Sequence, residues 1–321
     1  MWHKKLVHPE YFQGNKKKNN YFEGWYNKFV SGDEKDTIAI IPGVSINRDD
    51  QHAFIQVFLS HNTGKDISLS TYYFKYAFED FSFSHKEFWI RIGQNYFSNE
   101  RVELRLRNEN LSITGILTMH QQKPLQRSIL EPNIMGIFGY LGFMECYHGV
   151  VSMSHELKGK LSLNQNDIQF NKGKGYIEKD WGKSFPSSYV WMQSNHFSNQ
   201  DTSFMFSYAS IPFIGLHFNG LIVNLVYQGK EYRFATYNGA KVKHELIGNG
   251  YVHYKIKKGK YLLDIESTST TQIELASPRN GRMIEQIKEG LSGYIKLKLY
   301  VKDQLIYEDT GYHAGIEVMK K

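Results

Sequence analysis

The sequence predicts an all-β protein with little helix, organised as two similar antiparallel β domains in tandem. One observation is composition. Of the 321 residues 15% are aromatic, with 22 Tyr, 21 Phe and 5 Trp, and flat or β-branched side chains suit a half-buried pleated surface. A second observation is a dominant alternation of apolar and polar residues with period two, the period of a strand. The third is an internal repeat that spans the chain.

The alternation is clearest in three segments, and turn residues recur at short intervals between such runs. The segments are 101–107, 251–256 and 294–301; the turn signals are Asn62-Thr-Gly64, Asn108-Glu-Asn110, Gln228-Gly229, Asn238-Gly239 and Gly248-Asn-Gly250. This spacing predicts a meander of antiparallel strands, and therefore a barrel or a sandwich. A helix is expected only at 278–290, where Met283, Ile284 and Ile287 would form a short apolar face, and somewhere within 128–142.

The repeat appears when the sequence is shifted against itself by 165 residues. The coincidences are Asp36-Thr37 with Asp201-Thr202, Gly64-Lys65 with Gly229-Lys230, Thr71-Tyr72 with Thr236-Tyr237, Tyr147-His148 with Tyr312-His313 and, with one gap, Trp25 with Trp191. The matches follow one order along the whole chain. They predict one domain over residues 1–155 and a second over 156–321, each long enough for one antiparallel barrel.

Composition also limits the classes of function. The single cysteine, Cys146, excludes an internal disulfide and any zinc site built on paired thiolates. The formal net charge of +7 is consistent with an anionic partner or with a lysine-rich surface that keeps the protein soluble. No nucleic-acid-binding signature is present, and no partner of that kind is expected. The amino terminus lacks the apolar segment of a secretory signal, so a cytoplasmic location is expected.

The first candidate site lies on a predicted strand at 21–29. Alternation puts Tyr21, Glu23 and Trp25 on one face. A glutamate among aromatic rings would be partly desolvated, which raises its pKa and favours a role as proton donor. The alternative is a buried glutamate that is satisfied by a cation or by backbone N–H groups.

The second candidate site lies at 176–182. Tyr176, Glu178 and Asp180 share one face of the predicted strand, whereas Lys179 and Trp181 share the other. Two carboxylates at i and i+2 lie roughly 7 Å apart along a strand. Either one of them stays protonated, or a cation such as Lys183 holds both in the charged form. The alternative is a structural ion-pair network.

The strand predicted at 189–197 places Trp191, Gln193 and Asn195 on one face. An aromatic wall with two amides suits a ligand that has an apolar body and a few polar groups, although the same residues could fill a core. No phosphate-binding loop, dinucleotide fingerprint or nucleophile elbow occurs. The 13 His residues show no metal-site spacing, so neither a metal nor a cofactor is expected.

The segment 175–186, Gly-Tyr-Ile-Glu-Lys-Asp-Trp-Gly-Lys-Ser-Phe-Pro, followed by Trp191-Met-Gln193, resembles the signature of the tocopherol cyclase family. Further segments fit the same pattern from end to end: His8-Pro9, Phe12-Gln-Gly14, Phe22-Glu-Gly-Trp-Tyr26, Met144-Glu-Cys-Tyr-His-Gly149 and Ala314-Gly-Ile-Glu-Val318. The resemblance implies two lipocalin-like β-barrel domains, as in carotenoid hydratase-like proteins. The plant motif has Asn where this chain has Asp180, so an acid at this position is not general in the family.

The resemblance also implies a chemistry, in which an acid protonates an alkene of a prenylated hydroquinone and a phenolic oxygen closes the ring. A dry cavity would shield the cation, and aromatic faces would stabilise it. The expected proton donor is Asp180, followed by Glu178 or Glu23. The expected substrate-binding residues are Trp25, Tyr21, Tyr176, Trp181, Lys183, Trp191, Gln193 and Asn195.

Three functions therefore stay open at this stage. The first is a cofactor-independent cyclase or related enzyme that acts on a hydrophobic prenyl or lipid substrate. The second is a non-catalytic carrier of such a ligand, because a lipocalin-like architecture by itself does not specify catalysis. The third is a family member whose barrel is filled by its own side chains. A ligand of this kind would be collected by peripheral contact with a membrane.

Overall fold

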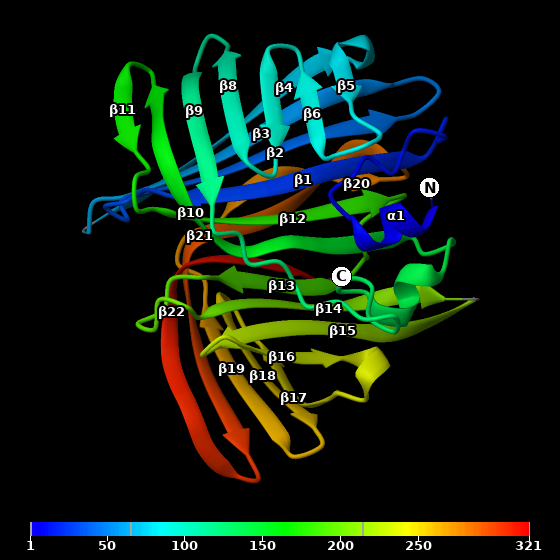
Figure 1. The fold of residues 1–321 in the computed structure, drawn as a ribbon, viewed down its shortest axis with the longest axis vertical. Helices are drawn as coiled ribbons and strands as arrows, with labels where there is room; N and C mark the ends of the chain where they lie inside the picture. The colour runs from blue at the N-terminus through cyan, green and yellow to red at the C-terminus, as the bar shows by residue number, and fades with distance from the viewer. Residues whose placement is uncertain (1, 65, 214, 321) are drawn as a thin grey trace. The chain divides into compact units, whose positions relative to one another are not determined.

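The computed structural model describes residues 2–64, 66–213 and 215–320, and it consists almost entirely of β-strands (Figure 1). The chain divides into two compact units. The first unit comprises Met1–Phe185 with Ala276–Gln286, and the second comprises Pro186–Leu275 with Ile287–Lys321. The all-β prediction is confirmed. The helices of the described residues are α1 (Trp2–Val7) and the short 3₁₀ helices η1 (Phe78–Asp80), η2 (Gly136–Tyr140) and η3 (Thr236–Asn238).

The first unit is built on a twelve-stranded antiparallel sheet. In sheet order its strands are β4 (Ile67–Ala77), β3 (His52–Asn62), β2 (Asp36–Ile46), β1 (Tyr21–Val30), β12 (Lys174–Gly182), β10 (Cys146–Leu163), β9 (Ser112–His120), β8 (Arg101–Arg107), β7 (Asn95–Ser98), β6 (Trp89–Ile92) and β5 (Phe81–Phe83), and β11 (Asn166–Gln169) pairs with β10 off this path. The core of the unit covers one face of the central strands, where Trp25, Phe29 and Ile177 are fully buried.

The second unit repeats this arrangement with a ten-stranded sheet. In sheet order its strands are β16 (Lys230–Ala235), β15 (Leu216–Tyr227), β14 (Ser203–Phe213), β13 (Tyr189–Ser194), β22 (Gln304–Met319), β21 (Arg282–Val301), β19 (Tyr261–Thr268), β18 (Tyr251–Lys258) and β17 (Lys241–Ile247), and β20 (Ile273–Arg279) pairs with β21. The strands β1 and β13 occupy equivalent places in their sheets, as the coincidence of Trp25 with Trp191 predicts.

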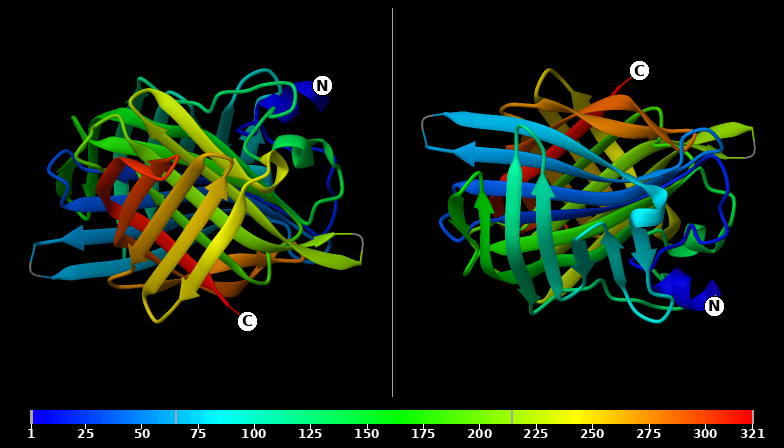
Figure 2. Two further views of the ribbon diagram at one scale, coloured as in Figure 1. Left: turned by 90° about the horizontal axis from the view of Figure 1, so that it is seen from below. Right: turned by 90° about the horizontal axis from the view of Figure 1, so that it is seen from above.

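The sheets are curled, but they do not close into the barrels that the sequence predicts. In the described part of the first unit, the sheet runs from β4 to β5, and the short helix η1 joins these two edge strands, which are not paired with each other. The helix η3 joins β16 and β17 in the second unit in the same way. Figure 2 shows the strong twist and curl of the strands from two further directions. Each sheet therefore curls around its core, and its two edge strands stay unpaired with each other.

The units divide at residues 185 and 186, whereas the repeat suggests a boundary near residue 156. Position 156 lies inside β10, and the next two strands, β11 and β12, pair with β10 and complete the first sheet. The last coincidence of the repeat is not a structural equivalence. Tyr147 and His148 lie on β10, which is second from β1, whereas Tyr312 and His313 lie on β22, which is next to β13.

The prediction of a helix at 278–290 is wrong, because this segment is the hairpin of β20 and β21. Its turn is formed by Asn280 and Gly281, which both have positive φ angles, 49° and 80°. Two residues with positive φ are the mark of the tight turn that joins two antiparallel strands. Only the tip of the hairpin, Ala276–Gln286, belongs to the first unit, where the Ser45 hydroxyl donates to the carbonyl of Gly281 over 2.8 Å.

Candidate active site

The candidate residues lie on three neighbouring strands of the first unit, β1, β12 and β10. In the register of β1 and β12, Glu23 faces Trp181 and Trp25 faces Lys179. In the register of β10 and β12, His148 is directly opposite Asp180. Residues that face each other across an antiparallel pair point to the same side of the sheet. The two pairings therefore decide which of the predicted site residues can act together.

The pairings separate the predicted residues into two groups on opposite faces of the sheet. Tyr21, Trp25 and Trp181 belong to or pack against the core of the unit, and Glu23 and Lys179 share their face through the alternation and the register. Tyr176, Glu178 and Asp180 alternate with these positions and lie on the other face. A single pocket lined by Glu23, Glu178, Asp180 and Trp25 is therefore excluded by the geometry of β12.

On the core face, Glu23 and Lys179 form an ion pair, and both side chains are completely buried. The Glu23 carboxylate also accepts hydrogen bonds from the backbone N–H groups of Gln13, at 2.8 and 3.0 Å, and of Gly14, at 2.9 Å. The Tyr21 hydroxyl donates to it over 2.5 Å. These donors and Lys179 occupy both oxygens. The geometry matches the alternative reading of Glu23, a satisfied structural carboxylate.

Lys179 connects this ion pair to the amino-terminal segment. Its ammonium group donates to the carbonyl oxygens of Pro9, at 2.8 Å, and Tyr11, at 2.6 Å. It also lies 4.5 Å from the ring centroid of Trp25 and 5.0 Å from that of Trp181, distances typical of cation–π contacts. Burial lowers the pKa of Lys179 to about 8, although Glu23 acts in the opposite direction. The Glu23–Lys179 ion pair therefore holds residues 9–14 against the core face of β1 and β12 through hydrogen bonds to their backbone.

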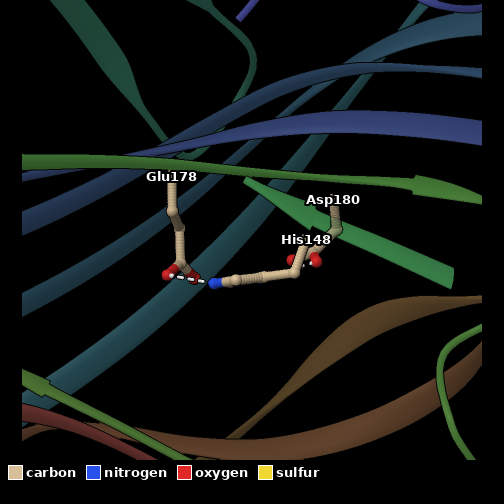
Figure 3. Close-up of side chains that lie close together, drawn as sticks. All are labelled: His148, Glu178 and Asp180. Atoms are coloured by element: carbon tan, nitrogen blue, oxygen red, sulfur yellow. Dashed lines mark hydrogen bonds and ion pairs between the residues drawn. The ribbon is translucent and has the colours of Figure 1, made fainter. Parts of the chain in front are cut away.

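On the opposite face, His148 lies between the two carboxylates of β12 (Figure 3). Its Nδ1 is 2.9 Å from Oδ1 of Asp180, and its Nε2 is 3.4 Å from Oε2 of Glu178. The Tyr176 hydroxyl donates to the same Glu178 oxygen over 2.5 Å. We call these four residues, Tyr176, Glu178, Asp180 and His148, the histidine–carboxylate cluster.

The electrostatics of the histidine–carboxylate cluster favour a charged imidazole. Burial alone lowers the pKa of His148, but the charges of Asp180 and Glu178 outweigh it and raise the pKa to about 10. Burial, followed by the nearby Glu178, raises the pKa of Tyr176 well above its ordinary value. At neutral pH the cluster therefore contains an imidazolium that two carboxylates hold in place.

Access to the cluster is uneven. The side chain of Asp180 keeps 24% of its surface exposed, compared with 11% for His148 and 5% for Glu178. Asp180 is thus the member that another molecule reaches most easily, and His148 lies directly behind it. The ligand atoms of the three side chains are within 4.8 Å of one another, a set that could also hold a metal ion.

The other predicted binding residues are distributed over both units. Trp181 stacks on Tyr147, with ring centroids 5.5 Å apart and an interplanar angle of 8°, and Lys183 is exposed. Trp191, Gln193 and Asn195 are buried residues of β13 and its end in the second unit. Trp191 and Gln193 alternate with Val190 and Met192, which belong to the core of that unit, so they point to the other face of its sheet.

The sequence did not identify His148 or Lys179 as site residues. His148 is 32 positions from Asp180, and only the pairing of β10 with β12 brings them together. The signal that was present is the similarity of 144–149 to the tocopherol cyclase pattern, which contains this histidine. For Lys179 the signal was its position between Glu178 and Asp180, on the face that also holds Glu23 and Trp25.

Several solved structures share this architecture at low sequence identity. A putative AttH from Nitrosomonas europaea matches with a TM-score of 0.55 and 14% identity, covering 95% of this chain and 94% of that one. Kievitone hydratase from Nectria haematococca matches with a TM-score of 0.54 and 11% identity, covering 94% of this chain and 89% of that one. CghA with Sch210972 matches with a TM-score of 0.58 and 8% identity, covering 93% of this chain and 88% of that one. The fold class is therefore that of two-domain, lipocalin-like β proteins.

The family follows from the sequence comparison. The tocopherol cyclase-like family matches residues 126–319, more than half of the chain, and the protein belongs to this family. The rice protein "Probable tocopherol cyclase, chloroplastic" (Oryza sativa subsp. japonica) is 24% identical over 173 residues, which are 50% of this chain and 36% of that protein. The match thus spans little more than a third of the rice protein. In the described residues, no helix is long and apolar enough to cross a membrane.

Proposed function

We propose that this protein is an enzyme that protonates an alkene of a prenylated hydroquinone or a related isoprenoid lipid and so closes a ring. The observation that supports this proposal best is the buried imidazole of His148 between Asp180 and Glu178. Such a cluster stores a proton at neutral pH next to an accessible carboxylate. Transfer of a proton from a positioned side chain to the substrate is general acid catalysis.

In the proposed reaction, the proton moves from Nδ1 of His148 to Oδ1 of Asp180, over the 2.9 Å that separates them, and from Asp180 to the alkene carbon. The alkene becomes a tertiary carbocation, and the cluster is left with one additional negative charge, which stabilises the cation. A phenolic oxygen then forms the C–O bond, and its proton returns to the cluster through Asp180. No atom is gained or lost, and no electron leaves the substrate.

The relatives support this class of chemistry through their names. The rice relative is described as a probable tocopherol cyclase, and one structural neighbour is a kievitone hydratase. Ring closure and hydration of an alkene both begin with a protonated alkene, and they differ in whether a phenolic oxygen or water adds to the cation. The cluster lies within the residues that match the family, whereas Glu23 lies outside them.

We test the proposal by incubating the protein with a prenylated hydroquinone in deuterated buffer and analysing the lipid by mass spectrometry. The expected product is an isomer of the substrate with one carbon-bound deuterium. An oxygen-18 label from water in the product would instead indicate hydration. If the substrate binds and is recovered unchanged and unlabelled, the protein is a carrier and the proposal is wrong.

We further propose that the lipid reaches the protein by peripheral contact with a membrane. The segment before β10 exposes several large apolar side chains, among them Ile129 (87% exposed), Leu130 (69%) and Phe143 (61%). Exposed apolar groups of this kind mark surfaces that bind lipid or protein. The double variant Ile129→Ser/Leu130→Ser should therefore float less with phosphatidylcholine vesicles than the wild type does. The matched control is Leu216→Ser, at another exposed leucine; equal flotation of wild type and double variant would contradict the proposal.

A further inference from the structure

A second group of histidine and carboxylate side chains lies on the sheet of the second unit, on β18 and β19. It consists of His253, Asp264 and Glu266, whose ligand atoms all lie within 4.8 Å of one another. The core of this unit contains Val252, Tyr254, Leu263 and Ile265, which alternate with the three residues along the same strands. The group therefore lies on the outer face of the sheet, where β17, β18 and β19 run side by side (Figures 1 and 2).

The strand register fixes the geometry of this group. His253 on β18 is directly opposite Glu266 on β19, and Asp264 precedes Glu266 by two residues, so all three side chains rise from one face. Nε2 of His253 is 2.7 Å from Oδ1 of Asp264. Ligands that stand on paired strands are held more rigidly than ligands on loops, which is the condition for a preformed site.

Each carboxylate has one oxygen held by a neighbouring donor. The Lys255 ammonium lies 3.3 Å from Oδ2 of Asp264, and the Tyr251 hydroxyl donates to Oε2 of Glu266 over 3.2 Å. The other oxygen of Asp264, Oδ1, is the one directed at His253. Outer contacts that orient metal ligands in this manner are typical of functional metal sites.

A second histidine lies close by on the edge strand β17. The ring of His244 packs edge-on against the ring of His253, with centroids 4.6 Å apart. One imidazole and two carboxylates are ligands that zinc and similar ions accept, whereas calcium and magnesium prefer oxygen ligands alone. On the neighbouring strand β21, Lys296 stands opposite Glu266 and Lys298 opposite Asp264, and both lysines pair with Glu308.

We propose that His253, Asp264 and Glu266 form a binding site for one divalent transition-metal ion of the zinc type. The ion connects β18 to β19 through these side chains. The site belongs to the second unit and is independent of the histidine–carboxylate cluster and of the proposed reaction.

The test is titration of the full chain, freed of metal with a chelator, with Zn²⁺ by calorimetry, and with Co²⁺ by visible absorption. The wild type should bind one equivalent at this site, and its Tm should rise with Zn²⁺ but not with Ca²⁺ or Mg²⁺. His253→Gln and Asp264→Asn should each weaken binding at least about 10-fold. They should also remove the Tm increase and the Co²⁺ absorption bands.

The matched control is His148→Gln, which alters the histidine–carboxylate cluster of the first unit, the other set in the described part of the chain that could hold a metal ion. If this variant still binds one equivalent that His253→Gln loses, the site is the one proposed here. Binding that His148→Gln abolishes and His253→Gln retains would overturn the proposal, as would a wild type that binds no Zn²⁺. Circular dichroism of His253→Gln checks that the exposed sheet face has kept its fold.

Discussion

Replacing His148 by glutamine should lower the rate of ring closure about 10²- to 10⁴-fold, the usual contribution of a general acid. Glutamine keeps much of the volume and one hydrogen-bonding group but cannot hold the proton that the neighbouring carboxylates keep on the imidazole. Asp180→Asn should cause a loss of the same order, because the amide keeps the shape of the carboxylate and cannot relay a proton. The measurement is kcat for the deuterium-incorporating reaction, with KM expected to change little.

Glu178→Gln separates the roles within the cluster. Glu178 accepts the Tyr176 hydroxyl and lies beside His148, but its side chain is nearly inaccessible, so we expect a positioning and electrostatic role. Its variant should lose less activity than Asp180→Asn. The control for all three variants is His120→Gln, at an exposed histidine on β9, which should leave kcat unchanged. A fully active Asp180→Asn variant would contradict the assignment of the proton relay.

The raised pKa of His148 also predicts how the stability of the His148→Gln variant depends on pH, a measurement that needs no substrate. The ordinary pKa of 6.5 rises to about 10 in the folded protein, so between these values the folded state holds a proton that the unfolded chain has lost. The stabilisation from His148 is therefore complete below about pH 6.5 and is lost as the pH rises toward 10. The difference in Tm between wild type and His148→Gln should shrink over this range, and a constant difference would contradict the ion-pair geometry.

The second large effect is expected at the buried ion pair on the core face. Lys179→Met should lower the free energy of unfolding of the first unit by about 3–5 kcal/mol, because it leaves the Glu23 carboxylate buried without its cation. It also removes the contacts to the carbonyl oxygens of Pro9 and Tyr11. Residues 9–14 should then exchange their amide hydrogens faster. Denaturation followed by tryptophan fluorescence measures the loss, since Trp25 and Trp181 flank Lys179.

The matched control is the double variant Glu23→Gln/Lys179→Met. Removing both charges avoids an uncompensated buried ion, so the double variant should be more stable than Lys179→Met alone. The activity of the double variant, measured at a temperature where it is folded, should remain closer to wild type than that of Asp180→Asn. If Glu23→Gln by itself abolishes turnover without loss of stability, then Glu23 is part of the active site and the structural role is wrong.

Much of the secondary structure could be predicted from local patterns in the sequence. The alternating segment 101–107 is β8, and the predicted strands at 176–182 and 21–29 lie within β12 and β1. Alternation is a local property, because successive side chains of a strand point to opposite faces. The same rule correctly separated Glu178 and Asp180 from Lys179 and Trp181 before any fold was known.

The prediction of a helix at 278–290 failed for a local reason as well. The spacing of Met283, Ile284 and Ile287 matches one turn of a helix, but the preceding Asn280-Gly281 is a strong hairpin signal. Ile284 is exposed and Ile287 is buried. This difference fits a strand, in which residues three positions apart point to opposite faces, whereas a helix would place both on one face. The turn signal should have outweighed the short apolar pattern.

The sequence by itself determined many of the strands, the face that each candidate side chain occupies along its own strand, and the family signature. The tertiary structure alone decided which strands are neighbours, and this choice placed Glu23 with Lys179 and His148 with Asp180. The physical reason is that alternation specifies a side without specifying a partner. The register of β10 on β12 joins residues 32 positions apart, through backbone pairing that no local pattern encodes.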